Sequence, residues 1–454
     1  MKCAWHNARL FSQDLPLPKL FRSLVVLLAL PFVLAGCKIN SINYFPPKPA
    51  HIRVINVLGT TTPINVTANG VAAWSGLTFE AMTGYQDFNN ATTEFVVSLA
   101  GSTTPLVSQS YNPAGEQSYT LVVYGPLNSP QIGVIADVLQ PPPSNQILVT
   151  VFNAAPVGNG LVLGNSAIDV YLTPPGQPID SISPNFFFIT YGTGNVFGQF
   201  SSGQYELRLT ITGTKTLIYD SGPLTFQSAT ATDVVIYSKG SAVLANVLLD
   251  DSDGAGQQVV ANSLLARIKA VNGAFQTGPV NQLLNGVAIT SNVALAAAST
   301  YNNVPSGAGT VTFEATSAPG AAIASISDTL GAATDQSIFV SGFAGATTAV
   351  ALQDNNLPPP AGFAAVRFVN TSPNSNPLNV LANNVSQVSS LGTYAASGYM
   401  SLASGTVAFT FNDSTTGATV LTMPGITLNA QQTSSVYVVG PAGALAGFVT
   451  PDTP

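Results

Sequence analysis

Cysteine and histidine, which supply many enzyme nucleophiles, bases and metal ligands, are scarce in this chain of 454 residues. The cysteines are Cys3 and Cys37, and the histidines are His6 and His51. A serine hydrolase needs a base beside its nucleophile, a thiol enzyme needs a cysteine, and zinc sites draw mainly on these two residue types. Beyond residue 37 only His51 remains, at the start of an apolar strand pattern. The sequence therefore predicts that the chain is not an enzyme and holds no zinc.

Carboxylates are the remaining candidates for chemistry. A pair of them can cleave a glycosidic bond, but the 20 acidic residues are scattered without an evident pair. The one dense cluster is Asp250-Asp251-Ser252-Asp253-Gly254. Calcium favours several oxygen ligands from a flexible loop, yet the cluster lacks EF-hand spacing and a closing Glu. A solvated linker is the favoured interpretation, and a calcium-stiffened joint stays open. We predict no metal site and no cofactor.

Aromatic residues that stack against sugar rings are a further possibility. Beyond the N-terminal segment the single tryptophan is Trp74, which fits a core position equally well. Phe186-Phe187-Phe188 stand in a row, so in a strand the middle ring points to the face opposite the other two. At least one ring is then expected on the surface, and core or interface packing is favoured over a ligand site.

Charge is unusually sparse. Charged residues make up 7% of the chain, against roughly 25% in an average soluble domain. The net charge is −7 and no basic run occurs, so we predict no nucleic-acid partner. Abundant Gly, Pro, Ser, Thr and Asn are typical of strands and turns rather than of surface helices.

The first residues have the pattern of a targeting segment. Lys2, Arg9, Lys19 and Arg22 precede an apolar run from residue 24 to residue 34, which is too short to span a bilayer. Leu34-Ala35-Gly36-Cys37 resembles the bacterial lipobox. This resemblance implies a lipoprotein signal peptide over residues 1–36, cleavage before Cys37 and a diacylglycerol on its sulfur. The alternatives are an ordinary secretory signal or a short anchor helix.

Cys37 is thus the predicted lipidation site, and it anchors the chain to a membrane. Residues 37–50 form a Pro-rich tether. Lys38, rather than Asp, follows the cysteine, which in enteric bacteria implies sorting to the outer membrane. The predicted location is the bacterial cell envelope, on its periplasmic or surface face.

Beyond the tether, one pattern recurs four times. Each copy opens with an apolar strand ending in Asn, at Asn56, Asn153, Asn272 and Asn370. About ten residues later comes an apolar pair around Asn or Asp, followed in three copies by a turn dipeptide suited to positive φ. These dipeptides are Asn69-Gly70, Asn285-Gly286 and Asn383-Asn384. Arg53, Lys269 and Arg367 lie three residues before the opening Asn, which indicates either an ion pair built into the fold or a solvated strand face.

Later in each copy come an alternating strand, a continuously apolar strand and a closing strand. Such spacing fits an all-β fold of four tandem immunoglobulin-like β-sandwich domains. The predicted repeats are residues 51–140, 146–250, 264–356 and 363–450, with spacers between them such as residues 250–262. The strand order and the oligomeric state stay open.

The repeats resemble the family catalogued as domain of unknown function 4397. Its usual start is an apolar strand running into Val-Asn-Ala-Ser-Pro. This start is best kept at Val369-Asn370-Thr371-Ser372-Pro373, next best at Phe152-Asn153-Ala154-Ala155-Pro156, and is looser in repeats one and three. The resemblance covers most of residues 51–450 and implies a β-rich extracytoplasmic domain. It brings no known activity, so it supplies no functional residues.

Together these features predict a non-enzymatic surface lipoprotein that serves as a modular display or spacer for envelope or extracellular interaction. The alternative is a carbohydrate- or peptidoglycan-binding protein, with specificity in variable segments such as residues 173–200. A weaker third possibility is an enzyme that uses acidic residues. The expected partners are the membrane, through the lipid on Cys37, and an envelope glycan or surface protein.

Overall fold

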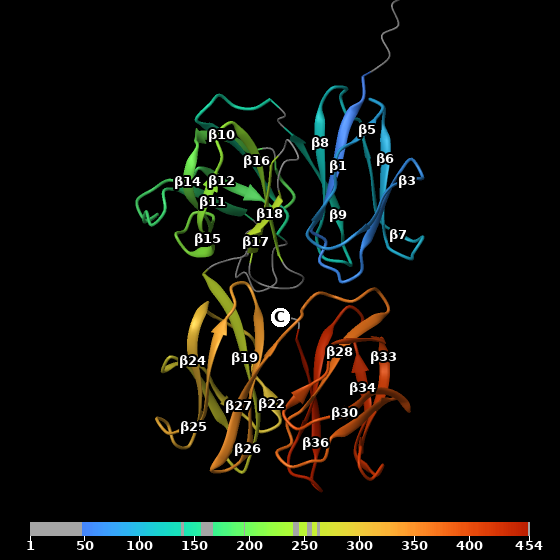
Figure 1. Cartoon of the computed structure of the whole chain (residues 1–454), viewed down its shortest axis with the longest axis vertical. Helices are drawn as coiled ribbons and strands as arrows, with labels where there is room; N and C mark the ends of the chain where they lie inside the picture. The colour runs from blue at the N-terminus through green and yellow to red at the C-terminus, as the bar shows by residue number, and fades with distance from the viewer. Residues whose placement is uncertain are drawn as a thin grey trace, which may run out of the picture. The chain divides into compact units, whose positions relative to one another are not determined.

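A computed structural model describes residues 48–137, 140–155, 167–194, 196–238, 245–251, 257–260 and 264–452 (Figure 1). The predicted signal peptide and Cys37 lie outside these residues. Every helix or strand element in the described ranges is a β-strand, which confirms the all-β prediction. In the same ranges, no helix is long and apolar enough to cross a membrane.

Four consecutive groups of strands repeat one architecture. The first repeat comprises β1 (Ala50–Asn56), β2 (Ile64–Ala68), β3 (Val71–Leu77), β4 (Ala81–Met82), β5 (Gln86–Phe88), β6 (Thr93–Leu99), β7 (Pro105–Tyr111), β8 (Ser118–Tyr124) and β9 (Gln131–Asp137). The second comprises β10 (Gln146–Asn153), β11 (Ala167–Thr173), β12 (Phe186–Thr190), β13 (Val196–Ser201), β14 (Gly203–Ile211), β15 (Leu217–Phe226), β16 (Thr230–Ser238), β17 (Ala245–Asp251) and β18 (Gln257–Val260).

The other two repeats follow the strand order of the first, whereas the second repeat has the single strand β13 on that side of its opening strand and an added edge strand, β18. The third comprises β19 (Leu265–Phe275), β20 (Val280–Leu284), β21 (Val287–Val293), β22 (Ala297–Ala298), β23 (Asn302–Pro305), β24 (Gly307–Ala315), β25 (Ala322–Leu330), β26 (Asp335–Phe343) and β27 (Ala346–Gln353). The fourth comprises β28 (Phe363–Asn370), β29 (Leu378–Ala382), β30 (Val385–Leu391), β31 (Ala395–Ala396), β32 (Met400–Ala403), β33 (Gly405–Asp413), β34 (Thr419–Leu428), β35 (Thr433–Val439) and β36 (Ala446–Pro451).

Each repeat contains two sheets. In the first sheet, the opening strand pairs in parallel with the long apolar strand, which pairs in turn with the closing strand, as in the β1, β8, β9 series. The second sheet has four antiparallel strands, in the order β3-β2-β6-β7 in the first repeat. A separate apolar core fills each repeat. Alternation places side chains such as Val407, Phe409 and Phe411 of β33 in this core.

The long apolar strands are buried on both faces. All seven residues of β8 and of β35 are buried. One face covers the repeat's own core, whereas the other contacts the first sheet of a neighbouring repeat. Side chains from repeats one and two share one apolar cluster, and side chains from repeats three and four share another. This second layer of burial explains why these strands lack polar alternation.

The predicted hairpin turns are confirmed. Both residues of each dipeptide have positive φ, for example 49° at Asn69 and 77° at Gly70. This backbone gives a two-residue turn whose twist matches that of the flanking strands. The turn Asn also caps a neighbouring strand, since Asn69 Oδ1 accepts a hydrogen bond from Glu94 N at 2.8 Å.

The Asn or Asp in the second strand of each repeat holds a bulge. Its side-chain oxygen accepts a hydrogen bond from a backbone N–H whose residue has positive φ. The four pairs are Asn65 with Gly76, Asp169 with Phe188, Asn281 with Asn292 and Asn379 with Ser390. The recurring polar residue in this apolar strand is therefore part of the fold.

One predicted spacer differs from the sequence interpretation. The predicted spacer at residues 250–262 contributes β18, in which Val260 is buried and its carbonyl accepts a hydrogen bond from Tyr219 OH at 3.0 Å. Asp250 and Asp251 end β17, while residues 252–254 of the proposed calcium cluster lie outside the described residues.

Candidate functional site

The three recurrent cations, Arg53, Lys269 and Arg367, are at most 2% exposed. They lie on the opening strands β1, β19 and β28, and each faces a hydroxyl residue across the parallel pair. Their side chains lie on the outer face of the first sheet, which the neighbouring repeat covers. The ion-pair interpretation is confirmed, and the solvated strand face is wrong.

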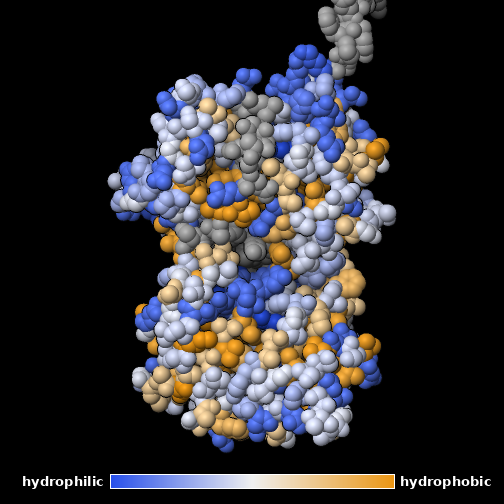
Figure 2. Space-filling view, in the orientation of Figure 1, coloured by the Kyte–Doolittle hydropathy of each residue, from blue (hydrophilic) through white to orange (hydrophobic). Residues whose placement is uncertain are grey.

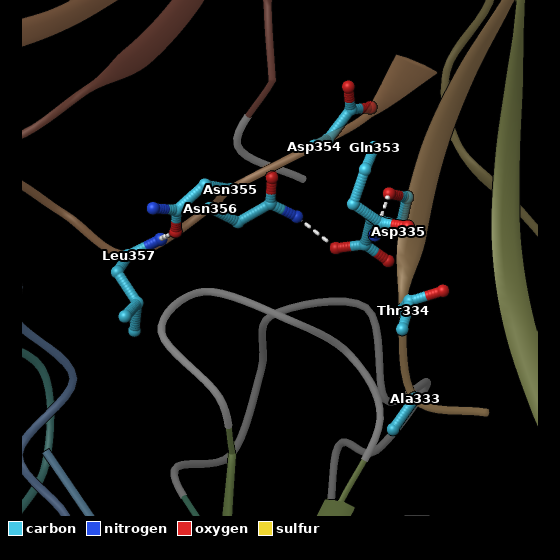
Figure 3. Close-up of a pocket in the computed structure, with 8 residues that line it drawn as sticks. All are labelled: Ala333, Thr334, Asp335, Gln353, Asp354, Asn355, Asn356 and Leu357. Atoms are coloured by element: carbon cyan, nitrogen blue, oxygen red, sulfur yellow. Dashed lines mark hydrogen bonds between the residues drawn. The ribbon is translucent and has the colours of Figure 1, made fainter. Parts of the chain in front are cut away.

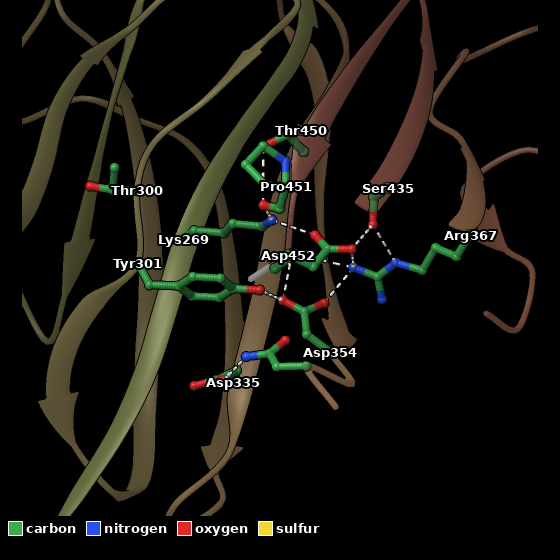
Figure 4. A network of polar contacts seen from close by, with 12 residues as sticks. Lys269, Thr300, Tyr301, Asp335, Asp354, Arg367, Ser435, Thr450, Pro451 and Asp452 are labelled. Carbon is green, nitrogen blue, oxygen red and sulfur yellow. Dashed lines mark hydrogen bonds and ion pairs between the residues drawn. The ribbon is translucent and has the colours of Figure 1, made fainter. Parts of the chain in front are cut away.

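Repeats three and four exchange ion pairs (Figure 4). Lys269 of repeat three pairs with Asp452 of repeat four, and also donates to Pro451 O at 2.9 Å. In the reverse direction, Arg367 of repeat four pairs with Asp354 of repeat three. Arg367 Nη2 also lies 4.0 Å from Asp452 Oδ2. Both carboxylates thus lie between cations in the interface.

Hydroxyl groups complete this network. Tyr399 OH donates to Asp452 Oδ2 at 2.7 Å, and Ser337 Oγ donates to Asp354 Oδ2 at 2.7 Å. Tyr301 OH donates to Asp354 as well. The Lys269 ammonium lies 4.8 Å from the centre of the Tyr301 ring, so the tyrosine also supplies a cation–π contact. Each carboxylate is stabilised by several donors, as a buried charge requires.

The first two repeats hold a related arrangement. Arg53 Nη2 of repeat one lies 3.4 Å from Asp233 Oδ2 of repeat two. Within repeat one, Tyr85 OH donates to Asp137 Oδ2 at 2.7 Å and Thr120 Oγ1 donates to it at 2.8 Å. In repeat two, Thr150 stands where the other repeats have the cation, and its strand partner is Asp233 rather than a hydroxyl residue. In this interface Arg53 bridges the two repeats.

The buried environment shifts the pKa values of the two carboxylates, Asp452 and Asp354, in opposite directions. Burial raises the pKa of Asp452, but the positive charges of Lys269 and Arg367 outweigh that effect and hold the pKa below its ordinary value. Burial raises the pKa of Asp354, and the Asp452 charge adds to that rise while Arg367 opposes it. Burial also raises the tyrosine pKa values at Tyr301 and Tyr399, which keeps both hydroxyls protonated as donors.

A pocket of about 370 Å³ lies beside this network (Figure 3). It is lined by Ala333, Thr334, Asp335, Gln353, Asp354, Asn355, Asn356 and Leu357. Its two carboxylates already have partners, because Arg267 Nε donates to Asp335 at 2.6 Å and Arg367 pairs with Asp354. Across the described residues, no group of three or more His, Cys, Asp or Glu side chains is placed to hold a metal. The pocket has polar groups that can hydrogen-bond but presents no unpaired carboxylate for acid–base chemistry.

Of the other candidate residues, Trp74 and Phe186 are buried, whereas Phe187 and Phe188 are exposed. His51 is near the start of β1, as expected, and its Nδ1 lies 2.6 Å from Asp87 Oδ1 on the neighbouring strand β5. Trp74 is 6% exposed and its ring centre lies 5.5 Å from that of Phe88, so it is a core residue. Phe186 is also buried, but Phe187 and Phe188 are 73% and 59% exposed. The bulge opposite Asp169 places both rings outside, in agreement with the prediction of at least one exposed ring.

Sequence reasoning missed the acidic side of the ion pairs. Asp137, Asp354 and Asp452 each come at or just after the end of a closing strand. The sequence does show that an acidic residue follows the last apolar run of these repeats. The sequence does not show which cation each acidic residue pairs with, because Lys269 and Asp452 are separated by 183 residues.

Comparisons with known proteins support the family but no function. The model of a domain of unknown function, DUF4397, matches residues 50–164, 266–380 and 364–454. No curated protein matches the chain.

Among solved structures, a carbohydrate-binding module, CBMbc (family CBM26) from Eubacterium rectale Amy13K in complex with maltoheptaose, is 10% identical. That match covers 46% of this chain and 95% of the module, with a TM-score of 0.16. The Bacillus anthracis TIE protein is 4% identical over 84% of this chain and 66% of that one, also with a TM-score of 0.16. Likeness at this level carries no functional argument. The family matches cover more than half of the sequence, and the chain belongs to the DUF4397 family.

Proposed function

We propose that this protein is a non-enzymatic lipoprotein of the bacterial cell envelope, held in the outer membrane by a diacylglycerol on Cys37. Its β-sandwich repeats act as a display or spacer for envelope or extracellular interaction. The observation that carries this proposal is the exchange of buried ion pairs between neighbouring repeats. These charges hold domains together, so they are not available to a substrate.

The energetics of the interface support a mechanical role. A buried ion pair is costly to break, because removing one partner leaves an uncompensated charge and destabilises a protein by about 3–5 kcal/mol. Lys269 and Arg367 tie repeats three and four in both directions. An apolar cluster around Phe339 and Tyr437 adds to the same contact. Repeats joined in this way resist separation, which suits a spacer.

The lipid anchor is tested by intact mass and detergent partitioning of the natively expressed chain. Wild type is expected to lose 36 residues, gain acyl mass and enter the detergent phase, whereas Cys37→Ser stays aqueous. Cys3→Ser is the matched control, because Cys3 lies in the predicted leader, and it should behave as wild type. Equal partitioning of wild type and Cys37→Ser would overturn the anchor.

Surface display is tested separately. A protease added to intact cells is expected to digest the repeats of wild type while a periplasmic marker stays intact. Protection of the repeats in intact cells, together with their digestion by the same protease once the outer membrane is permeabilised, would place them inside the outer membrane and refute display.

A further inference from the structure

Two adjacent phenylalanines on the second repeat are exposed. Phe187 and Phe188 lie on β12, an edge strand of the second sheet of that repeat. Their exposed fractions are 73% and 59%. Figure 2 shows hydrophobic atoms gathered on the second repeat around the place where Figure 1 labels β12. Side chains this apolar are normally buried, so their exposure calls for an explanation.

The backbone gives a second, independent observation. Phe188 has a φ of +55°, a conformation that is unfavourable for a bulky side chain. The equivalent bulge residue is Gly76 in repeat one, Asn292 in repeat three and Ser390 in repeat four. The bulge therefore forms without an aromatic residue. Strain of this kind is typical of functional sites, and here it turns the second ring outward.

We propose that Phe187 and Phe188 form a stacking platform that binds a neutral glycan chain. The flat face of a pyranose ring carries C–H groups with partial positive charge. The face of an aromatic ring is negative, so the two attract each other while apolar area is removed from water. Two neighbouring phenyl rings can contact successive sugar units.

The surroundings favour a neutral sugar over other partners. Asp180 is the only charged residue between positions 173 and 200. The nearby Lys215 ammonium is already held by Ile182 O and by Tyr171 OH. A single engaged cation is a weak attraction for phosphate or an anionic membrane, which bind to clusters of Lys and Arg. Ser181, Ser183 and Asn185 are exposed just before the rings, where their polar groups suit sugar hydroxyls.

The exposed area of the two rings also favours a sugar over a protein partner. The two rings expose about 260 Å², taking about 200 Å² for each side chain. A stable protein interface buries about 800 Å² on each partner. A phenyl pair of this size suits one or two sugar rings better than a protein surface.

The test measures binding of maltohexaose, cellohexaose and N-acetylchitohexaose to the purified chain by calorimetry. At least one hexasaccharide is expected to bind wild type, and Phe187→Ala is expected to weaken that binding by tenfold or more. Phe197→Ala is the matched control, because Phe197 is also exposed, at 67%, but lies on β13 of the other sheet. Its affinity should equal that of wild type.

Phe188→Asn separates a binding role from a structural one. Asn occupies this position in repeat three, so the variant should unfold at a higher urea concentration than wild type and yet bind the sugar at least tenfold more weakly. A loss of stability would show that the ring serves the fold. Failure of wild type to bind any hexasaccharide at 10 mM, or unchanged binding in Phe187→Ala, would overturn the proposal. Vesicle binding or self-association that depends on these rings, without sugar binding, would also overturn it. None of these results affects the lipid-anchor assay.

Discussion

Replacing Asp452 by Asn tests whether the exchanged ion pairs hold repeats three and four together. Asp452 is fully buried and accepts hydrogen bonds from Tyr399 and Ser435, besides pairing with Lys269. The substitution keeps the shape but removes the charge, so Lys269 is left buried without its carboxylate. Removing one partner of such a pair costs about 3–5 kcal/mol. A loss of that size is a large part of the stability of most domains.

Hydrogen exchange with mass spectrometry locates the effect in the full-length chain. A loss of 3 kcal/mol should raise exchange of protected amides in residues 264–452 by more than about 100-fold where exchange follows global opening. Trp74 lies in the core of repeat one, and it reports that repeat by fluorescence in a chain without residues 1–36, which hold the other tryptophan, Trp5. Its urea midpoint should stay unchanged in Asp452→Asn, because the lost contact joins only the last two repeats.

Two further variants make the result decisive. Asp328→Asn removes a half-buried carboxylate from repeat three, and the new amide oxygen can still accept the hydrogen bond from Thr329 N. Exchange should therefore stay within about 0.5 kcal/mol of wild type. Lys269→Met added to Asp452→Asn removes the orphaned charge, so the double variant should be more stable than Asp452→Asn alone. A cost below about 1 kcal/mol for Asp452→Asn, or no recovery in the double variant, would refute the reasoning.

Three other outcomes are expected. The pKa of Asp452 is lowered in the folded state, so the folded chain binds fewer protons at this residue than the unfolded chain does. The Asp452 carboxylate therefore stabilises the fold above about pH 4, and this stabilisation is lost as the pH falls through the folded-state pKa. The urea midpoints of the last two repeats should therefore fall more steeply on acidification in wild type than in Asp452→Asn. The pKa of Asp354 is raised in the folded state, so in both proteins its protonation makes the fold more stable as the pH falls. Trp74→Ala should destabilise repeat one by about 3–5 kcal/mol, seen as faster exchange in residues 50–137, and unchanged exchange would contradict its core position. Asn281→Ala removes the acceptor for Asn292 N and Thr316 Oγ1, both at 3.0 Å, and should cost about 1–3 kcal/mol by urea unfolding; a shift confined to repeats one and two would contradict this.

Much of the fold could be predicted because its signals are local. The dipeptides at Asn69, Asn285 and Asn383 predict the hairpins, since a two-residue turn needs residues that tolerate positive φ. Alternation in β33 predicts one buried face. The recurrence of the opening Asn predicts four copies of one unit, and the family match supports repeated domains.

Less of the candidate site could be predicted. The recurrent cations at Arg53, Lys269 and Arg367 indicated an ion pair, but a solvated face had the same sequence pattern. The exposure of Phe188 depends on a bulge opposite Asp169, and one extra residue in a strand moves every later side chain to the other face. No periodicity within Phe186-Phe187-Phe188 marks that bulge.

By itself the sequence determined the strand-rich class, the fourfold repetition and the turn positions, because each follows from the conformational preferences of a few neighbouring residues. Tertiary structure alone decided which charges meet. Lys269 reaches Asp452 of the next repeat, and Arg367 reaches back to Asp354, because the first sheets of neighbouring repeats pack face to face. Such pairing depends on how two folded surfaces dock, which no local pattern encodes.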